Sequence, residues 1–289
     1  MTYVLLAATC SVLVSVLLKL AGRRGIDAGQ IVTWNYLVTA LLCAWLLEAP
    51  LDSLRQPGAP WLPLLVLAVV LPSLFLVLAA SVRAAGIVRT DIAQRLSLLL
   101  SLLAAFLWFG ESANGLKLAG LGLGLLSVVA ILARPQAAAS SAGTLQAAAW
   151  PLLLTVWVGF AVVDVMLKQI AASGTPFAAS LQVSFVLAFV GMLLVQAWRH
   201  ARGRSRFSWG NAGAGVLLGL LNFGNIVFYV HAHRALPENP SLVFAAMNIG
   251  VVVLGTLVGV LACREKPGRM NWLGIALAVP AIVLIALSR

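Results

Sequence analysis

Long uncharged apolar runs constrain this chain more than any other feature. Leu62 to Ala80 and Leu98 to Phe109 consist mainly of Leu, Val and Ala and contain no charged residue. A helix needs about 20 such residues to cross the hydrocarbon core of a bilayer, roughly 30 Å thick. A transmembrane β-barrel would instead show alternating segments of about 10 residues. The runs therefore predict an all-α integral membrane protein.

Ten such runs account for most of the chain. Of its 289 residues, 62% are hydrophobic and only 9% are charged. Soluble domains average roughly 45–50% apolar and about 25% charged residues. Disordered chains have fewer apolar and more charged residues than that. The composition thus excludes a soluble enzyme and a disordered protein. We expect transmembrane helices at residues 2–21, 29–48, 61–83, 89–109, 116–133, 147–171, 177–198, 210–233, 241–263 and 270–287.

The sequence lacks a signature of catalysis or of metal binding. It contains no phosphate loop, no HExxH motif and no serine-hydrolase order of residues. Its three cysteines form no CxxC pair, and His231 and His233 are too few to hold a metal. We expect no enzyme activity, no cofactor, no metal and no ATPase module, so any transport would be secondary or facilitative.

The basic residues are distributed unevenly between the predicted loops. The formal net charge of +11 would suggest nucleic acid in a soluble chain, but this chain has little soluble surface. With ten spans, both termini lie on the same side of the membrane. The loops and termini on that side contain four basic residues, and the loops on the other side contain twelve. The positive-inside rule makes the twelve-residue side cytoplasmic and both termini external, in a bacterial inner membrane. We interpret the run Arg199–Arg206 as an anchor beside anionic lipid and expect no nucleic-acid partner.

The two halves of the sequence share landmarks at a constant offset. Glu111 follows the fourth span and Gly120 comes nine residues later, whereas Glu265 follows the ninth span and Gly274 comes nine residues later. The offset is 154 residues in both cases. In the spans before them, Ser101 and Ala105 correspond to Gly255 and Gly259. Earlier in the chain, the residues Val16 to Lys19 correspond to Val165 to Lys168 at an offset of 149.

Five spans in each half require the second half to be inverted in the membrane. We predict a first five-helix repeat at 1–133, a linker at 134–146 and a second repeat at 147–289. Inverted repeats are a common plan of secondary transporters, in which the substrate site lies near the midplane where the repeats meet. The glycine pairs Gly120/Gly124, Gly215/Gly219 and Gly255/Gly259 are small-xxx-small steps, which favour close helix packing.

Ten spans in two halves, each with a glutamate after its fourth span and a glycine nine residues later, resemble the EamA-type permeases of the drug/metabolite transporter superfamily. The matching residues are Gly110, Glu111, Gly120, Glu265 and Gly274. The resemblance implies alternating-access transport of small organic molecules. Two features depart from it: Arg264 is the counterpart of Gly110, and neither half has the proline often found within the fourth span. Many members are drawn with cytoplasmic termini, whereas the loop charges here predict external ones.

Ionisable residues within the first and sixth spans are candidates for function. A charged side chain at the centre of a membrane helix costs at least about 2.5–3.5 kcal/mol. Asp164 and Lys168 are spaced i,i+4 on one face of the sixth span, which Trp157 extends. In the first span, Ser11, Ser15 and Lys19 form a polar stripe at the same spacing. The alternatives are a structural ion pair and a lysine that reaches the interface.

The fourth and eighth spans carry further polar faces. Asp91, Gln94 and Arg95 lie at the start of the fourth span, and Asn248 is the counterpart of Gln94. In the eighth span, spacings of 3 and 4 place several polar groups on one face. The alternative is interhelical hydrogen bonding, worth about 0.6 kcal/mol on average. The predicted substrate-binding residues are Asn222, Asn225, Tyr229, Asn248, Gln94, Asp164, Lys168, Trp157, Asn35, Ser15 and Lys19, and the predicted coupling or gating residues are Asp164, Asp91, Arg95, Glu111 and Glu265.

The mixed charges within the spans favour a small polar or zwitterionic substrate, such as an amino acid or a drug-like amine, carried by an exporter or exchanger. Asp164 is the candidate for proton coupling, because an apolar environment raises the pKa of a carboxyl group. One alternative is an organic-anion or sugar-phosphate exchanger that binds through Lys19, Arg95 and Lys168. Another is a lipid-handling enzyme, a flippase or a non-transporting scaffold. The expected partners are a small-molecule substrate, the bilayer and protons, in a monomer or homodimer.

The predicted topology can be tested at Cys263. This residue lies at the end of the ninth span, which the loop charges place on the cytoplasmic side. A membrane-impermeant thiol reagent added to intact cells should leave Cys263 unlabelled, and permeabilised cells should expose it. Labelling of Cys263 from outside only would contradict the predicted orientation.

Overall fold

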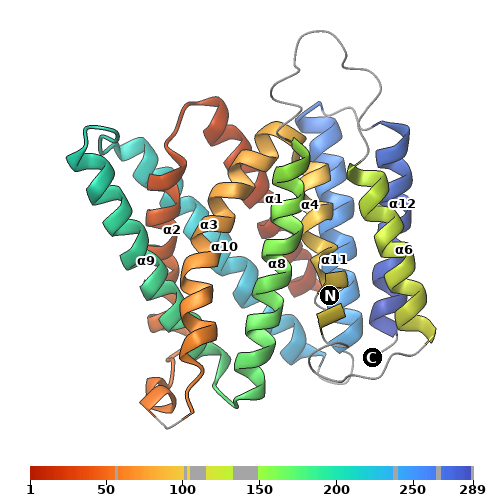
Figure 1. Cartoon of the computed structure of the whole chain (residues 1–289), viewed down its shortest axis with the longest axis horizontal. Helices are drawn as coiled ribbons and strands as arrows, with labels where there is room; N and C mark the ends of the chain where they lie inside the picture. The colour runs from red at the N-terminus through yellow and green to blue at the C-terminus, as the bar shows by residue number, and fades with distance from the viewer. Residues whose placement is uncertain are drawn as a thin grey trace. The chain divides into compact units, whose positions relative to one another are not determined.

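The computed structural model is helical in the parts of the chain that it describes (Figure 1). It describes residues 1–55, 58–100, 103–104, 115–132, 149–236, 240–264 and 268–287, and no strand occurs in these ranges. In the first part of the chain the elements are α1 (Thr2–Arg23), α2 (Ala28–Leu46), η1 (Leu51–Arg55), α3 (Trp61–Ala85), α4 (Ile87–Arg95) and α6 (Gly115–Leu132). In the second part they are α8 (Ala149–Ala172), α9 (Phe177–Ala201), α10 (Trp209–Ala235), α11 (Pro240–Leu257) with the π turn η2 (Val258–Ala262), and α12 (Arg269–Leu287).

A helix lies at each of the ten places where the sequence predicts a span. Within the described ranges, seven helical segments are long and apolar enough to cross a bilayer. This confirms an all-helical, multi-pass membrane protein. The number of ten crossings stays a prediction, because part of the fourth span is not described. The linker 134–146, Ser101, Ala105, Gly110, Glu111 and Glu265 also lie outside the described residues.

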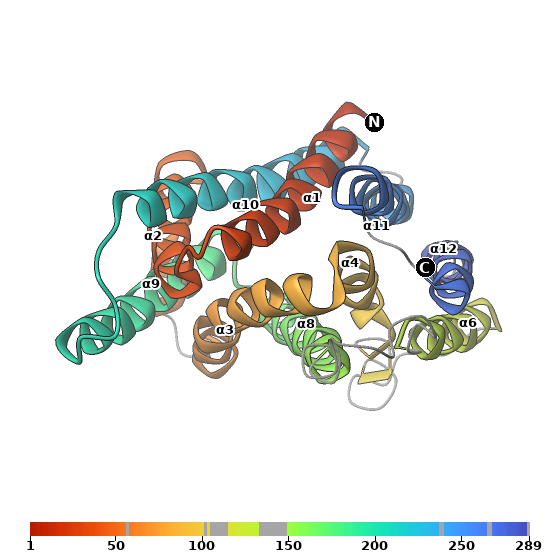
Figure 2. The same ribbon diagram turned by 90° about the horizontal axis from the view of Figure 1, so that it is seen from above.

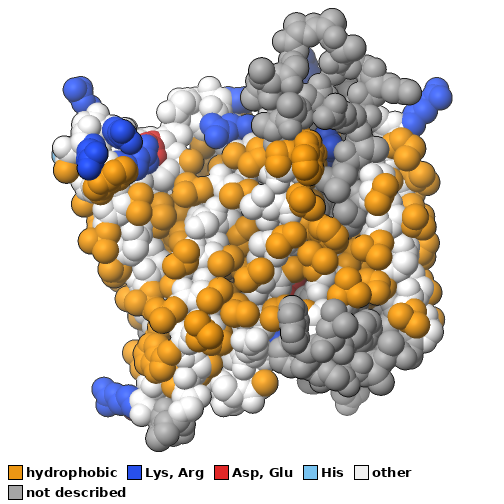
Figure 3. All heavy atoms as spheres, in the orientation of Figure 1, with side chains coloured by type: hydrophobic (Ala, Val, Ile, Leu, Met, Phe, Trp, Pro, Cys, Tyr) orange, Lys and Arg blue, Asp and Glu red, His pale blue; other side chains and the backbone are white. Residues whose placement is uncertain are grey.

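Large apolar side chains cover much of the outer surface of the helices. Trp45, Leu62 and Leu261 are each about three-quarters exposed. Figure 3 shows one face, on which apolar side chains run along the helices and Lys and Arg side chains stand near the helix ends. A soluble monomer rarely leaves so much continuous apolar surface in water. The exposed faces therefore fit contact with lipid.

The chain divides into two compact units. The first comprises Met1–Val16, Ala80–Ala161 and Gly224–Arg289, and the second comprises Leu17–Ala79 and Val162–Phe223. The boundaries fall within α1, α3, α8 and α10, so these four helices contribute to both units. Each unit combines segments from both predicted repeats.

In the first unit, α6 and α12 pack closely against each other (Figure 2). Ser127 Oγ donates a hydrogen bond of 2.7 Å to the carbonyl oxygen of Gly274. A Cβ atom added at Gly120 would lie 2.7 Å from Ile285 Cγ1 and 3.1 Å from the carbonyl oxygen of Ala281. Residue numbers rise along α6 as they fall along the facing side of α12, so the two helices are antiparallel.

In the second unit, α2 packs between α9 and α10. Cys43 at the end of α2 contacts Ala178 at the start of α9, whereas Asp27 before α2 pairs with Arg199 near the end of α9. These two helices are therefore also antiparallel. The buried ring of Tyr36 lies between α3 and α9, with its centroid 6.0 Å from the centroids of Phe75 and Phe185.

Glycines on α10 allow α2 to approach closely. A Cβ atom at Gly215 would lie 2.5 Å from Trp34 Cβ and 2.7 Å from the carbonyl oxygen of Ile31. One turn later, a Cβ at Gly219 would lie 2.7 Å from Val38 Cβ. Real Cβ atoms do not come this close to backbone, so the pair acts as the packing step that its spacing predicts.

We predict that Gly215→Ala destabilises the protein. The added methyl group meets backbone that cannot rotate away, and such overpacking typically costs about 1–3 kcal/mol. Gly213→Ala is the matched control, because a Cβ there has no neighbour within 4 Å. Thermal unfolding of the purified variants in detergent should show a lower midpoint for Gly215→Ala alone. Equal midpoints for the two variants would contradict the close packing.

Candidate functional site

A buried polar layer joins α1 and α4 in the first unit, formed by Ser11, Ser15, Asp91 and Arg95. Ser15 Oγ donates a hydrogen bond of 2.7 Å to Asp91 Oδ1. One turn away, Arg95 Nη2 donates a hydrogen bond of 2.7 Å to Ser11 Oγ. Asp91 is only 3% exposed. The layer thus brings one carboxylate and one guanidinium to the same helix, α4.

Helical periodicity explains why these four side chains meet. Ser11 and Ser15 are one turn apart on α1, and Asp91 and Arg95 are one turn apart on α4. Residues at this spacing lie on the same face of a helix, so two polar steps face each other between α1 and α4. Hydrogen bonds to ionised groups are roughly twice as strong as those between neutral groups. The two serines therefore stabilise both charges where water is scarce.

The α4 helix is interrupted beside this layer. It ends at Arg95, Leu96 forms a turn, and helical geometry resumes at 97–100. The carbonyl oxygen of Leu96 accepts a hydrogen bond of 2.8 Å from Trp157 Nε1 of α8. Interrupted helices at membrane depth occur where protein groups satisfy the freed backbone, and they often line binding sites. No proline marks this break, so the apolar run predicted a continuous fourth span.

The backbone of α11 closes the layer from a third side. A Cβ atom at Gly255 would lie 2.7 Å from Asp91 Oδ2, so the carboxylate occupies the space that any side chain would need. Asn248, two turns earlier on α11, is 7% exposed and donates to the carbonyl oxygen of Phe244 on its own helix. Gly255 therefore fixes how closely α11 approaches Asp91.

Other predicted residues of the first unit serve helix contacts. Asn225 Nδ2 donates a hydrogen bond of 2.8 Å to the carbonyl oxygen of Ala7, which ties α10 to α1. The Tyr229 side chain packs against an apolar cluster of α1 and α11 residues, and its ring lies 4.6 Å from the ring of His233. Gln94 is half-buried on α4. The amide of Asn225 thus makes an interhelical hydrogen bond, which was the alternative to substrate binding for this face.

The remaining predicted residues lie in the second unit. Asn222 Nδ2 donates a hydrogen bond of 3.2 Å to Asn35 Oδ1, between α10 and α2. Lys19 is buried on α1, and Asp164 and Lys168 are half-buried on α8. The predicted site residues are thus shared between the two units, and Ser15, Asp91, Arg95 and Trp157 are the ones that meet around α4.

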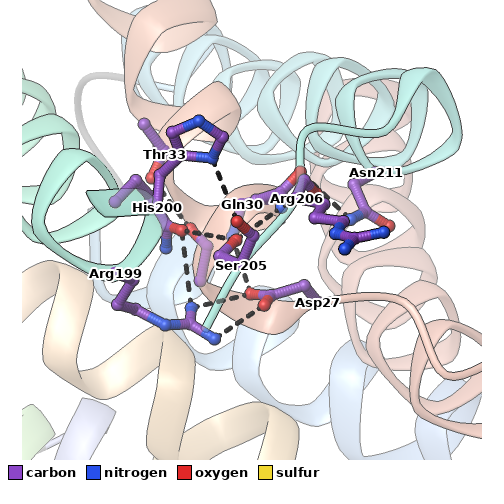
Figure 4. A network of polar contacts seen from close by, with 10 residues as sticks. Asp27, Gln30, Thr33, Arg199, His200, Ser205, Arg206 and Asn211 are labelled. Carbon is purple, nitrogen blue, oxygen red and sulfur yellow. Dashed lines mark hydrogen bonds and ion pairs between the residues drawn. The ribbon is translucent and has the colours of Figure 1, made fainter. Parts of the chain in front are cut away.

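A second polar network, which sequence analysis did not identify, ties α2 to the end of α9 (Figure 4). Arg199 Nη1 and Nη2 donate to the two carboxylate oxygens of Asp27 at 3.0 and 2.7 Å. Gln30 Nε2 donates to Ser205 Oγ at 2.8 Å and to the carbonyl oxygen of Arg206 at 2.7 Å. Asn211 Nδ2 donates to Gln30 Oε1 at 3.0 Å. The network orders the connection between α9 and α10.

A local signal in the sequence marks one part of this network. Asp27 precedes an apolar helix and is followed three residues later by Gln30, a spacing typical of a helix N-terminus. Asp27 Oδ1 accepts a hydrogen bond from the Gln30 backbone N–H at 3.1 Å and so caps α2. Burial acts to raise the pKa of Asp27, but the hydrogen bonds from Arg199 and the backbone outweigh it and lower the pKa.

Comparison with known proteins agrees with this architecture. The family model described as the EamA-like transporter family matches residues 1–133. An uncharacterized protein of Haemophilus influenzae is 39% identical over 286 residues, which cover 96% of this chain and 94% of that protein. A crystal structure of a protein with 17% identity is similar in fold, with a TM-score of 0.55 over 100% of this chain and 98% of that chain.

These matches and the apolar helices define a multi-pass membrane protein of the transporter class. The chain belongs to the EamA-like transporter family, within the drug/metabolite transporter superfamily. This confirms the family resemblance predicted from the repeated glutamates and glycines. A small-molecule substrate and a lipid environment follow from the family.

We predict that the pair Asp27–Arg199 stabilises the protein only while Asp27 is ionised. Because folding lowers the pKa of Asp27 from its ordinary 3.8, the stabilisation is present above that pH and is lost as the pH falls through the lowered pKa. Asp27→Asn keeps a good helix cap but removes the charge. The thermal midpoint of the wild type should exceed that of Asp27→Asn at pH 7, and the difference should shrink as the pH falls below 3.8.

The size of this effect is limited by exposure. Both side chains are about one-quarter exposed, so a contribution of about 1 kcal/mol or less is expected. Asp52→Asn is the control, since Asp52 pairs with Arg55 at a fully exposed position. A difference between wild type and Asp27→Asn that stays the same at pH 7 and pH 3 would show that the charge plays no part.

Proposed function

We propose that this protein is an alternating-access transporter of small zwitterionic metabolites, of the amino-acid or drug-like amine type, working as an exporter or exchanger. The observation that supports this most is the polar layer between α1 and α4. Asp91 and Arg95 bring opposite charges to one face of an interrupted helix, with Gly255 of α11 against the carboxylate. A zwitterion carries the two complementary charges.

The chemistry of the layer suits a substrate that replaces existing bonds. The guanidinium of Arg95 presents several donors in a planar fork, which matches a carboxylate in two places. Asp91 is an acceptor for an ammonium group. Ser11 and Ser15 each share one hydrogen bond with these side chains. A zwitterionic substrate replaces these neutral partners with charged groups, which favours binding.

We further infer that the two halves form inverted repeats, because a two-fold axis in the membrane plane makes counterpart helices antiparallel. The counterparts α6 and α12 are antiparallel, as are α2 and α9. Two contacts between α6 and α12 are also related by the offset of 154 residues. At this offset, Gly274 is the counterpart of Gly120 and Ala281 is the counterpart of Ser127. The contact of Ser127 with Gly274 thereby becomes the contact of Gly120 with Ala281.

A third contact supports the same symmetry. Tyr36 and Phe185 are each other's counterparts at the offset of 149 residues, and their rings are 6.0 Å apart. A residue that contacts its own counterpart lies next to the symmetry axis. The family model also ends at residue 133, where we place the end of the first repeat. Alternating access follows from such repeats when one moves against the other.

Counterflow measurements in proteoliposomes test the proposed role of Asp91 and Arg95. We expect Asp91→Asn to raise the KM mainly for substrates with an amine, and Arg95→Gln mainly for those with a carboxylate, by about tenfold or more. Removing a charged hydrogen-bond partner costs roughly 1.5–3 kcal/mol, which corresponds to about 10- to 150-fold in affinity. The panel should contain amino acids, amines, carboxylates and sugar phosphates.

Matched variants separate binding from folding. Asp52→Asn and Arg55→Gln change the same residue types at exposed positions and should leave counterflow unchanged. A thermal midpoint for each variant shows whether it is folded. Counterflow of carboxylates and phosphates but not of zwitterions would favour the organic-anion exchanger instead. Unchanged transport in folded Asp91→Asn and Arg95→Gln would overturn the proposed site.

Proton coupling is assigned to Asp164, which is half-buried on α8. The same counterflow assay, run over a range of pH, tests this assignment. Asp164→Asn should flatten the pH profile while it leaves the relative order of substrates unchanged. An unchanged profile would remove Asp164 from this role and leave the α1–α4 layer as the proposed substrate site.

A further inference from the structure

A cavity of about 280 Å³ opens in the second unit between α2, α9 and the segment 202–208. Its apolar wall is formed by Leu37, Phe189, Leu193 and Phe207. Leu193 and Phe207 are both about half exposed, so this wall continues onto the outer surface of the helices. The volume lies at the lower end of the roughly 300–1,000 Å³ found for small-molecule sites. It is sufficient for part of one acyl chain.

The opposite end of the cavity is polar. Gln30, Gln196, His200 and Ser205 line it. Gln196 Oε1 accepts from Ser205 Oγ and from Arg199 Nη1, both at 3.4 Å. Because Arg199 has only donors, the amide oxygen of Gln196 must face it and the amide nitrogen is left for another acceptor. Within the described part of the chain, that buried nitrogen has no hydrogen-bond partner, and it packs against Gly29.

Basic residues follow His200 in the sequence and flank Ser205, two residues that line the polar end. Arg202, Arg204 and Arg206 are exposed, and the first two hold their guanidinium groups over the ring of Trp198, at 5.1 and 5.7 Å from its centroid. The nearby carboxylate of Asp27 is already paired with Arg199. Figure 3 shows Lys and Arg side chains gathered where α9 ends. The rim therefore complements an anion.

Aromatic side chains place this rim at the membrane surface. The Phe207 ring lies 6.2 Å from that of Trp34 and 5.0 Å from that of Trp209, which is 82% exposed. Tryptophan is enriched at the level of the lipid headgroups. The polar end thus lies at headgroup depth, and the apolar wall extends along α9 towards the hydrocarbon core.

We propose that this cavity binds one anionic phospholipid. One acyl chain occupies the apolar wall beside Leu193 and Phe189, and the phosphate lies at the polar end beside Ser205, within reach of the exposed arginines of 202–206. A zwitterionic lipid offers the same chain but no net negative charge, so it binds less tightly. The bound lipid bridges α2, α9 and the segment 202–208 and stabilises the network around Gln30.

Thermal unfolding of the full-length protein in detergent tests this proposal, with added phosphatidylglycerol or phosphatidylcholine. Phosphatidylglycerol should raise the midpoint in a saturable manner and phosphatidylcholine should raise it much less. Leu193→Trp fills the cavity and should abolish the difference. Leu194→Trp is the matched control, because its neighbour Leu194 is exposed but does not line the cavity. It should respond like the wild type.

The rim is tested by charge removal. Each arginine near an anionic surface contributes enough to change the apparent affinity about fivefold. Arg202→Gln combined with Arg204→Gln should therefore weaken phosphatidylglycerol binding by about 25-fold, whereas Arg55→Gln at the other end of the unit should not. Native mass spectrometry of the same samples should show one retained lipid in the wild type and none in Leu193→Trp.

Three results would overturn the proposal. The first is an equal response to both lipids, which would indicate general solvation by lipid. The second is a phosphatidylglycerol response in Leu193→Trp that matches the wild type. The third is the same shift with inorganic phosphate alone at the same concentration, which would indicate a soluble anion. Because transport is not measured, these outcomes do not depend on the proposed function.

Discussion

The lack of water in the hydrocarbon core governs the polar contacts between the membrane helices. A polar group that crosses the core must find a partner within the chain, because lipid offers none. Asp91 and Arg95 meet this condition with serines of α1, and the carbonyl oxygen of Leu96 meets it with the backbone N–H of Leu99 and the indole N–H of Trp157. These bonds connect α1, α4 and α8. The residues that we propose for substrate binding are thus also ones that hold the helices together.

Small residues make these polar contacts geometrically possible. Hydrophobic attraction between helices is weak in lipid, so van der Waals packing and close approach have a larger role. Gly255 lets α11 reach the carboxylate of Asp91, and Gly215 lets α10 reach the backbone of α2. A side chain at either position would separate the helices. The glycines therefore determine the distances at which polar groups on neighbouring helices can bond.

The charged end of the second unit follows different physics. The proposed lipid site puts the carboxylate of Asp27 and the arginines of 199–206 at the level of the headgroups, where water, phosphate and protein groups compete for the same hydrogen bonds. Arg199 is used within the protein, whereas Arg202 and Arg204 rest on Trp198 and face outwards. A segment that looks like a simple topology signal in the sequence thus combines an internal tie, an aromatic support and a rim of positive charge.

The sequence by itself determined the class of protein, because helix length and hydrophobicity must match the bilayer and both can be read from composition. It also indicated the family, through Glu111, Gly120 and their counterparts, and it identified Asp91, Arg95 and Ser15 as polar groups on helical faces. Only the tertiary structure decided which faces meet. It paired Ser15 with Asp91 and gave Asn225 a backbone partner on α1. It also interrupted α4 at Leu96 without a proline and joined Asp27 to Arg199 across 172 residues. Periodicity specifies the face on which a residue lies, but the partner of that face depends on packing between segments far apart in the chain.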